Sequence, residues 1–65
     1  MLNALSTRER EVLLHFSSGL TYAQIGRRMG ISPSTVDTYL RRIKQKTGFT
    51  VSAELILLGS QLRDV

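Results

Sequence analysis

The chain has 65 residues, which is enough for one small domain with a thin hydrophobic core. It contains no cysteine, which excludes disulfides and thiolate metal sites. No apolar segment has the length of a membrane-spanning helix or the form of a secretory signal, so we expect a cytoplasmic protein with no membrane partner. The formal net charge is +4, and the excess lies in residues 27–46, which carry six basic side chains and one acid. We call this stretch the basic segment.

The first helix is predicted over about residues 7–18. Ser6 and Glu9 have the S-x-x-E spacing of a capping box, in which each side chain accepts a hydrogen bond from the backbone amide of the other residue. Gly19 ends such a helix in the left-handed conformation. Glu9 and Glu11 lie too close together, on what we expect to be one exposed helix end, to form a carboxylate pair across a cleft. We therefore assign Glu9 to capping rather than to catalysis.

The second helix is predicted over about residues 22–29. Thr21 and Gln24 form a second capping box at its start, and Gly30 ends it. One stripe of side chains at helical spacing is expected to be buried. It consists of Tyr22, Ile25 and Met29.

The third helix is predicted over about residues 33–47. Ser32 is its N-cap, and Pro33 takes the first helical position, where no hydrogen-bond donor is lost. Gly48 ends the helix. Its buried stripe is expected to consist of Val36, Leu40, Ile43 and Thr47.

The second and third helices have the spacing of a helix-turn-helix. Gly26 is small enough for the two helices to cross closely, Gly30 makes the turn, and Val36 faces the second helix as a core contact. In this motif the later helix enters the major groove of DNA. The basic segment coincides with the motif, which favours a phosphate-binding surface over an ordinary solvated face. We therefore predict double-stranded DNA as the partner.

The face of the third helix opposite its buried stripe is expected to read bases. Asp37 and Arg41 are four residues apart and share this face. Arginine pairs with guanine O6 and N7, and an acid accepts from cytosine N4, so Asp37 either reads a cytosine or holds Arg41 on a guanine. The alternative is a plain surface ion pair. The residues predicted to read bases are Ser34, Asp37, Thr38 and Arg41. Those predicted to contact phosphates are Thr35, Arg42, Lys44, Gln45 and Lys46.

The fourth helix is predicted over about residues 52–63, capped by Thr50 or Ser52. It carries two apolar stripes, whereas a terminal helix needs only one. We expect one stripe to pack on the core and the other on a second copy of the chain, and the alternative is scattered surface apolar residues. The predicted core stripe is Leu55, Leu58 and Leu62. The predicted dimer interface is Ala53, Ile56, Leu57 and Ser60.

The sequence has few of the groups that an enzyme requires. His15 has no second histidine at metal-ligand spacing, and there is no glycine-rich phosphate loop. We expect no enzymatic activity, no metal, no cofactor and no small-molecule ligand in this domain.

Several motifs, in order along the chain, closely resemble the LuxR/GerE-type DNA-binding domain. The resemblance covers about residues 5–63 and implies a single domain over residues 1–65, an all-α four-helix bundle. In that family the third helix is the recognition helix, the fourth helix dimerises, and the domain regulates transcription from inverted-repeat promoter sites. The motifs are LSTREREVL at residues 5–13, the break at residues 19–21, QIGRRMGIS at residues 24–32, STV at residues 34–36, and Lys46-x-Gly48.

The chain also departs from that family. Asp37 stands where the family often has a basic residue, and Val51 and Ser52 replace its usual polar residue and arginine, so no phosphate contact is carried over to these positions. The fourth region of a sigma factor is a rival with a similar start and recognition helix, but the apolar stretch 52–63 argues against it. A protein-interaction module that keeps the fold is favoured by Asp37 and opposed by the basic segment. RNA polymerase is a further candidate partner.

Overall fold

The computed structural model describes residues 4–49 and 52–63, without the side chains of residues 62 and 63. Within this part the ordered elements are all helices, which confirms the predicted all-α class. The observed bounds agree with the predicted ranges, except that the first helix ends one residue earlier. The helices are α1 (Thr7–Ser17), α2 (Tyr22–Met29), α3 (Pro33–Thr47) and α4 (Ser52–Arg63).

The first two helices begin at the predicted capping boxes. Ser6 Oγ accepts from the Glu9 amide at 3.1 Å, and Glu9 Oε1 accepts from the Ser6 amide at 2.8 Å. Thr21 and Gln24 exchange the same pair of bonds at 3.2 and 2.8 Å. Each box satisfies two backbone groups that a helix start would otherwise leave unpaired, so both starts are set within one turn of sequence.

Glycines end α2 and α3 in the left-handed conformation. Gly30 has a φ of 69° and Gly48 a φ of 76°, values that a residue with a Cβ atom adopts only with strain. The cap of α4 was predicted to be Thr50 or Ser52. Ser52 is the first residue of α4, and Thr50 lies outside the described residues.

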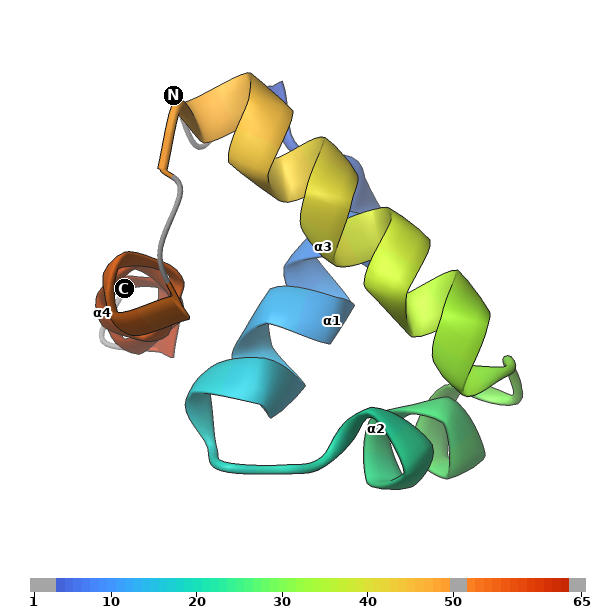
Figure 1. Ribbon diagram of the computed structural model, residues 1–65. Coiled ribbons are helices and arrows are strands. Elements are labelled where there is room, and N and C mark those ends of the chain that lie inside the picture. Colours follow the sequence, from blue (N-terminus) through green and yellow to red (C-terminus); the bar gives the residue numbers. More distant parts are fainter. Residues whose placement is uncertain (1–3, 50–51, 64–65) are drawn as a thin grey trace.

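Helix α1 occupies the centre of the fold. It contacts α2, α3 and α4, and Figure 1 shows it between α4 on one side and α3 on the other. Helix α2 crosses the N-terminal end of α3, while the C-terminal end of α3 lies beside the first residues of α1 (Figure 1). All four helices contribute to the buried core, and Leu5, which precedes α1, completes it. The core residues are Leu5, Val12, Leu13, Ile25, Val36, Leu40, Ile43, Leu55 and Leu58.

The predicted buried stripe of α2 is wrong at its first position. Ile25 is buried and Met29 is half-buried, but Tyr22 is 37% exposed. Its ring meets Phe16 edge-on, with the centroids 6.3 Å apart. Because Tyr22 is the first residue of α2, it lies at the edge of the core, where one side of the ring packs and the other meets solvent. In the core stripe of α4, Leu55 and Leu58 are buried as predicted, and the side chain of Leu62 lies outside the described part.

A close approach between α1 and α4 depends on a glycine that the sequence analysis did not single out. A Cβ atom at Gly59 would lie 2.5 Å from Ser17 Cβ and 2.8 Å from the Leu13 carbonyl oxygen. Only a residue without a side chain fits at this distance. A glycine inside a helical pattern is itself a signal of such packing.

Candidate nucleic-acid interface

The turn between α2 and α3 leaves no room for a side chain at Gly26. A Cβ atom there would lie 2.5 Å from the backbone oxygen of Ile31, whose amide donates to the Gly26 carbonyl at 2.9 Å. The small residue is therefore required, but its nearest neighbour is the turn rather than the body of α3. Val36 is fully buried, as its predicted core contact requires. Together these positions hold α3 at a fixed angle to α2.

Hydroxyl groups crowd the N-terminus of α3. Ser32 Oγ accepts from the Thr35 amide at 3.2 Å and lies 2.9 Å from Thr35 Oγ1 and 3.1 Å from Ser34 Oγ. One turn later, Thr38 Oγ1 donates to the Ser34 carbonyl at 3.1 Å. The Thr38 hydroxyl is thereby left with acceptor capacity toward solvent. This end of α3 presents small polar groups in a pre-ordered arrangement.

The predicted base-reading residues all lie away from the buried stripe of α3. We call the face formed by Ser34, Asp37, Thr38 and Arg41 the reading face. Ser34, Thr38 and Arg41 are exposed, and Asp37 is half-buried at its side. The 3.6-residue period places this face opposite Val36, Leu40 and Ile43, which are buried against the rest of the fold. The reading face is therefore open to solvent.

Asp37 and Arg41 form an ion pair on the reading face. Asp37 Oδ2 lies 2.7 Å from Arg41 Nη2, and the two side chains are 36% and 74% exposed. An exposed pair at this spacing contributes only about 0.3–0.5 kcal/mol to stability. The contact turns one edge of the guanidinium toward Asp37 and leaves its remaining donors in solvent.

The predicted phosphate contacts lie on both flanks of the reading face. Thr35 and Arg42 lie on one flank, where the Arg42 guanidinium is 5.9 Å from the centroid of the Tyr39 ring. Lys44 lies on the other flank and is half-buried, whereas Gln45 is exposed between the flanks. Thr35, Arg42 and Lys44 thus lie beside the reading face, and Gln45 lies in line with it.

Lys46 is the predicted phosphate contact whose ammonium group is already bound. Its Nζ atom lies 2.8 Å from Oε1 of Glu9, across 37 residues of sequence. The Lys46 side chain is 39% exposed and that of Glu9 is 3% exposed. The same Glu9 oxygen also accepts from the Ser6 amide, so one carboxylate oxygen caps α1 and holds the end of α3.

The expectation that Glu9 lies on an exposed helix end was wrong. Its position beside Val12 and Leu13 on the inner face of α1 leaves the residue only 2% exposed. Burial raises the pKa of the Glu9 carboxyl, but the hydrogen bonds from Lys46 and Ser6, together with the positive charge of Lys46, outweigh it and bring the pKa below its ordinary value. Glu9 is therefore a buried carboxylate with both a capping and a tertiary role.

Arg8 makes a second long-range contact from the same turn of α1. Its Nη2 atom donates to the Met29 carbonyl at 3.0 Å, and Nη1 lies 3.3 Å from Glu11. Met29 is the last residue of α2, where a helix leaves carbonyls without internal partners. Sequence reasoning missed this contact because the two residues are 21 positions apart and no periodic pattern links them.

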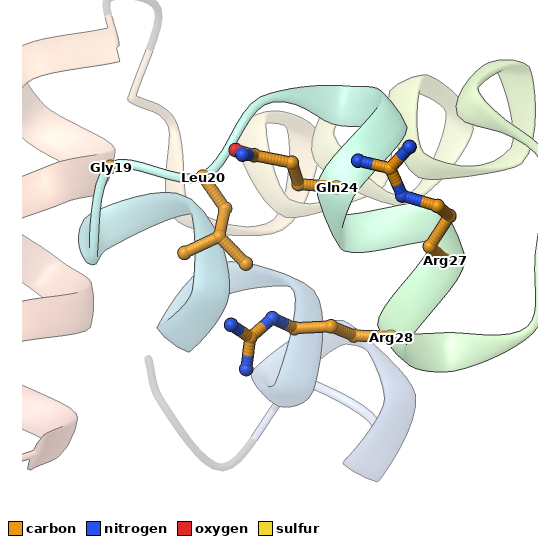
Figure 2. A pocket seen from close by; sticks show the side chains of 5 residues that line it. All are labelled: Gly19, Leu20, Gln24, Arg27 and Arg28. Atoms are coloured by element: carbon orange, nitrogen blue, oxygen red, sulfur yellow. The ribbon is translucent and has the colours of Figure 1, made fainter.

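A second basic surface lies on the outer side of α2. A hollow there is lined by Gly19, Leu20, Gln24, Arg27 and Arg28, and Figure 2 shows Gln24 and Arg28 reaching from α2 toward the Gly19–Leu20 turn. No residue of α3 lines it. In the described part of the chain, neither arginine pairs with an acid, in contrast to Arg41 and Lys46. The charge of the basic segment is thus divided between two faces.

The outer stripe of α4 is apolar and exposed. Leu57 is 66% exposed and Ile56 is 40% exposed, and Ala53 is exposed beside them, whereas Ser60 is half-buried. Leu58, on the opposite side of the helix, is 5% exposed. The two stripes predicted for this helix therefore differ in environment, with one in the core and the other in solvent.

The described residues contain no grouping of three or more acidic or histidine side chains that could hold a metal ion. Across residues 4–49 and 52–63, none of the helices combines the length and apolarity needed to cross a bilayer.

The helix-turn-helix geometry agrees with a comparison against known families. The profile described as sigma-70, region 4 matches residues 1–47, which is most of the chain and reaches the end of α3. The chain belongs to this family. The family match covers the same three-helix unit that carries most of the LuxR/GerE resemblance. The sigma-factor region and the LuxR/GerE-type domain therefore share one DNA-binding architecture over these residues.

Two curated regulators are similar to this sigma-70 region 4 domain over 57 residues, or 88% of the chain. Transcriptional activator protein EsaR of Pantoea stewartii subsp. stewartii is 42% identical. Probable transcriptional regulatory protein SgaR of Hyphomicrobium methylovorum is 39% identical. The chain spans about a quarter of the length of these relatives, 23% and 27%. No solved structure matches it.

The regulators extend the similarity beyond the family profile. Because 57 of the 65 residues are aligned, both alignments reach at least residue 57 and include the first half of α4, which the profile does not cover. Both relatives are named as transcriptional regulators, which supports the LuxR/GerE-type resemblance. The domain is of the helix-turn-helix DNA-binding type.

Proposed function

We propose that this domain binds double-stranded DNA sequence-specifically and regulates transcription as a dimer on an inverted-repeat promoter site. The observation that carries the proposal is the reading face of α3, which is exposed opposite a fully buried stripe and flanked by basic side chains. A helix with this surface fits the major groove.

Base recognition is proposed for Ser34, Asp37, Thr38 and Arg41. The 2.7 Å ion pair orients the Arg41 guanidinium while leaving it mostly exposed, which is the condition for a paired contact to guanine O6 and N7. Asp37 lies near phosphates in any groove-bound arrangement, where an acid lowers affinity unless it contributes to sequence preference. We therefore assign Asp37 to positioning Arg41 or to accepting from a cytosine amino group.

Phosphate contacts are proposed for Thr35, Arg42, Lys44 and Gln45. Thr35, Arg42 and Lys44 flank the reading face on its two sides, as the two strands flank a major groove, and Gln45 is exposed between them. The fifth residue predicted for this role, Lys46, is set apart from these four because its ammonium is bound to Glu9.

Dimerisation is proposed through the outer stripe of α4, Ala53, Ile56, Leu57 and Ser60. Exposed apolar side chains that adjoin on one helix face mark interaction surfaces more often than isolated ones do. A single helix pair buries little area, so we expect weak association that becomes evident on a two-half-site duplex.

The proposal is tested by selecting bound sequences from a random DNA pool, followed by salt titrations on the preferred duplex and on random DNA. We expect an inverted repeat to emerge and affinity to fall steeply with salt through counterion release. Arg41→Ala should weaken binding to the preferred duplex by about 1–3 kcal/mol and binding to random DNA much less. A pool that yields no preferred sequence would reject sequence-specific binding.

A second candidate is promoter binding in the manner of sigma-factor region 4, with RNA polymerase as partner. The observation in its favour is the family match over residues 1–47. This mode requires one copy on a single site without a second half. Selection of an unrepeated site, bound by one copy of the domain at all concentrations, would favour it over the dimeric regulator.

A further inference from the structure

Two adjacent residues of α1 contact the C-terminal ends of the two helices of the helix-turn-helix. Arg8 donates to the carbonyl of Met29, the last residue of α2, at 3.0 Å. Glu9 accepts from Lys46, in the last turn of α3, at 2.8 Å. Neither contact arises from the helix-turn-helix itself, so the motif is supported from outside at two points.

The contact to α3 is made at the C-terminal end of that helix. Helix α2 crosses the N-terminal end of α3, and the C-terminal end lies beside the start of α1 (Figure 1). In the last turn of α3, Thr47 is buried and donates to the Ile43 carbonyl within the same helix. The ion pair to Glu9 is therefore a direct polar link between this end of α3 and the rest of the fold.

The geometry of this link restrains Lys46. The Glu9 carboxylate is 3% exposed and is fixed by the capping box, so it cannot follow a moving ammonium group. Reaching Glu9 turns the Lys46 side chain toward α1 and away from the reading face. A charge-assisted hydrogen bond to this fixed carboxylate holds the Lys46 ammonium group in one position.

The contact to α2 acts at the turn. The Met29 carbonyl belongs to the last turn of α2 and directly precedes Gly30, whose left-handed conformation sets the direction of the chain into α3. A guanidinium here satisfies an otherwise unpaired carbonyl and places positive charge at the negative end of the helix dipole. It therefore fixes the point from which α3 departs.

We infer that the first turn of α1 positions the recognition helix for DNA, with Arg8 setting where α3 begins and Glu9, through Lys46, setting where it ends. In this assignment Lys46 is a positioning residue and not a phosphate contact. The inference rests on the proposed DNA-binding function.

The decisive variant is the double substitution Glu9→Gln with Lys46→Gln, which removes the ion pair without changing net charge. The glutamine oxygen can still accept from the Ser6 amide, so the start of α1 is kept. Binding is measured by fluorescence anisotropy on the selected duplex and on random DNA over a range of salt. The temperature is one at which circular dichroism shows every variant folded. Arg42→Gln, on the same flank of α3, serves as the phosphate-contact control.

We expect the double variant to lose about tenfold in the ratio of preferred to random affinity, since a charged hydrogen bond of typical strength corresponds to at least that factor. Its salt slope should equal that of the wild type, whereas Arg42→Gln should have a slope shallower by about one unit. An unchanged ratio with a slope shallower by one unit would make Lys46 a phosphate contact and overturn the inference.

Arg8 has its own matched pair of variants. Arg8→Met removes the bond to the Met29 carbonyl, while Glu11→Gln removes only the ion pair and keeps that bond. We expect Arg8→Met to lower the preferred-to-random ratio and Glu11→Gln to leave it unchanged. Equal ratios for both variants would remove Arg8 from the positioning role.

A readout without DNA separates this inference from the proposed function. Amide hydrogen exchange in the last turn of α3 should be faster in the double variant than in the wild type, while exchange in α2 stays unchanged. Equal exchange rates in the last turn of α3 would overturn the inference even if the wild type binds DNA. A wild type without any preferred sequence would instead refute the proposed function, whatever the exchange rates.

Discussion

At the scale of single residues, the charges of the chain have distinct roles. Arg41 is bound to Asp37 on the reading face, and Lys46 is bound to Glu9 beneath it, whereas Arg42 lies over the Tyr39 ring. We therefore expect the six basic side chains of the basic segment to contribute unequally to DNA binding. Among the described residues, Arg41 and Lys46 have acidic partners that set their directions.

Because of Glu9, we expect the stability of the domain to depend on pH in the acidic range. Because its pKa is lowered in the folded state, the charged carboxylate stabilises the fold fully above the ordinary glutamate pKa of about 4.3. This contribution is lost as the pH falls through the lower pKa of the folded protein. We expect the urea midpoint of the wild type to drop below about pH 4.3 more steeply than that of Glu9→Gln. Parallel curves for Glu9→Gln and the wild type would contradict the assignment.

Asp37 tests whether the ion pair reads bases. Asp37→Lys replaces an acid by a base and frees Arg41, so random DNA should bind more tightly while the gap to the preferred duplex narrows. Gln45→Lys adds positive charge at an exposed position and keeps the ion pair. This variant should bind both duplexes more tightly and keep the difference in affinity between them. If Asp37→Lys leaves the ranking of single-substitution operators untouched, the pair is a plain surface ion pair.

At the scale of elements, each helix combines a local start with a specific neighbour. Helix α2 requires a glycine against the turn, and α4 requires a glycine against α1. Helix α3 has the most demanding surface, because one side must be fully buried and the other must stay polar and free. The packing of these helices therefore depends on glycines at close contacts as well as on apolar stripes.

Gly59→Ala tests the packing of α4 on α1. Alanine favours helix more than glycine does, yet its Cβ atom would meet Ser17 and the Leu13 carbonyl. We expect overpacking to dominate and to lower the free energy of unfolding by about 1–3 kcal/mol in urea titrations. Adding Ser17→Gly removes the Ser17 Cβ and Oγ atoms and should restore part of the loss. A Gly59→Ala protein more stable than the wild type would show that the helices move apart at little cost.

At the scale of the whole molecule, one helix is enclosed and three surfaces are exposed to solvent. Helix α1 is enclosed by the other three helices, while the reading face of α3, the basic hollow of α2 and the apolar stripe of α4 all face solvent. A 65-residue chain builds one small core, and the apolar side chains of Ile56 and Leu57 lie outside it.

Leu57→Glu tests the proposed dimer. The side chain is 66% exposed, so the charge should leave the fold intact and disturb only a contact made outside it. We expect the variant to bind a single half-site as the wild type does and to lose cooperative binding to the inverted repeat, as measured by titration of one- and two-half-site duplexes. Ser52→Glu adds the same charge to α4 outside the stripe and should keep cooperativity. Cooperative binding by a folded Leu57→Glu protein would exclude α4 from the interface.

The sequence alone determined the four helices, their bounds to within one residue, and the helix-turn-helix. It could do so because capping boxes, terminal glycines and buried stripes act within one or two turns of chain, where residue type and spacing decide the structure. The exposed reading face followed from the stripe of α3, since a helix that buries one side presents the other. The edge position of Tyr22 did not follow, because helical spacing does not reveal where a core ends.

Only the tertiary structure decided which distant groups meet. The bond of Arg8 to the Met29 carbonyl spans 21 residues and that of Glu9 to Lys46 spans 37, and Gly59 packs on Ser17 from the opposite end of the chain. No local pattern encodes these pairs, because each depends on the angles at which helices cross. The same reason explains why Glu9 is a buried anion rather than a surface cap, and why Lys46 lies against it.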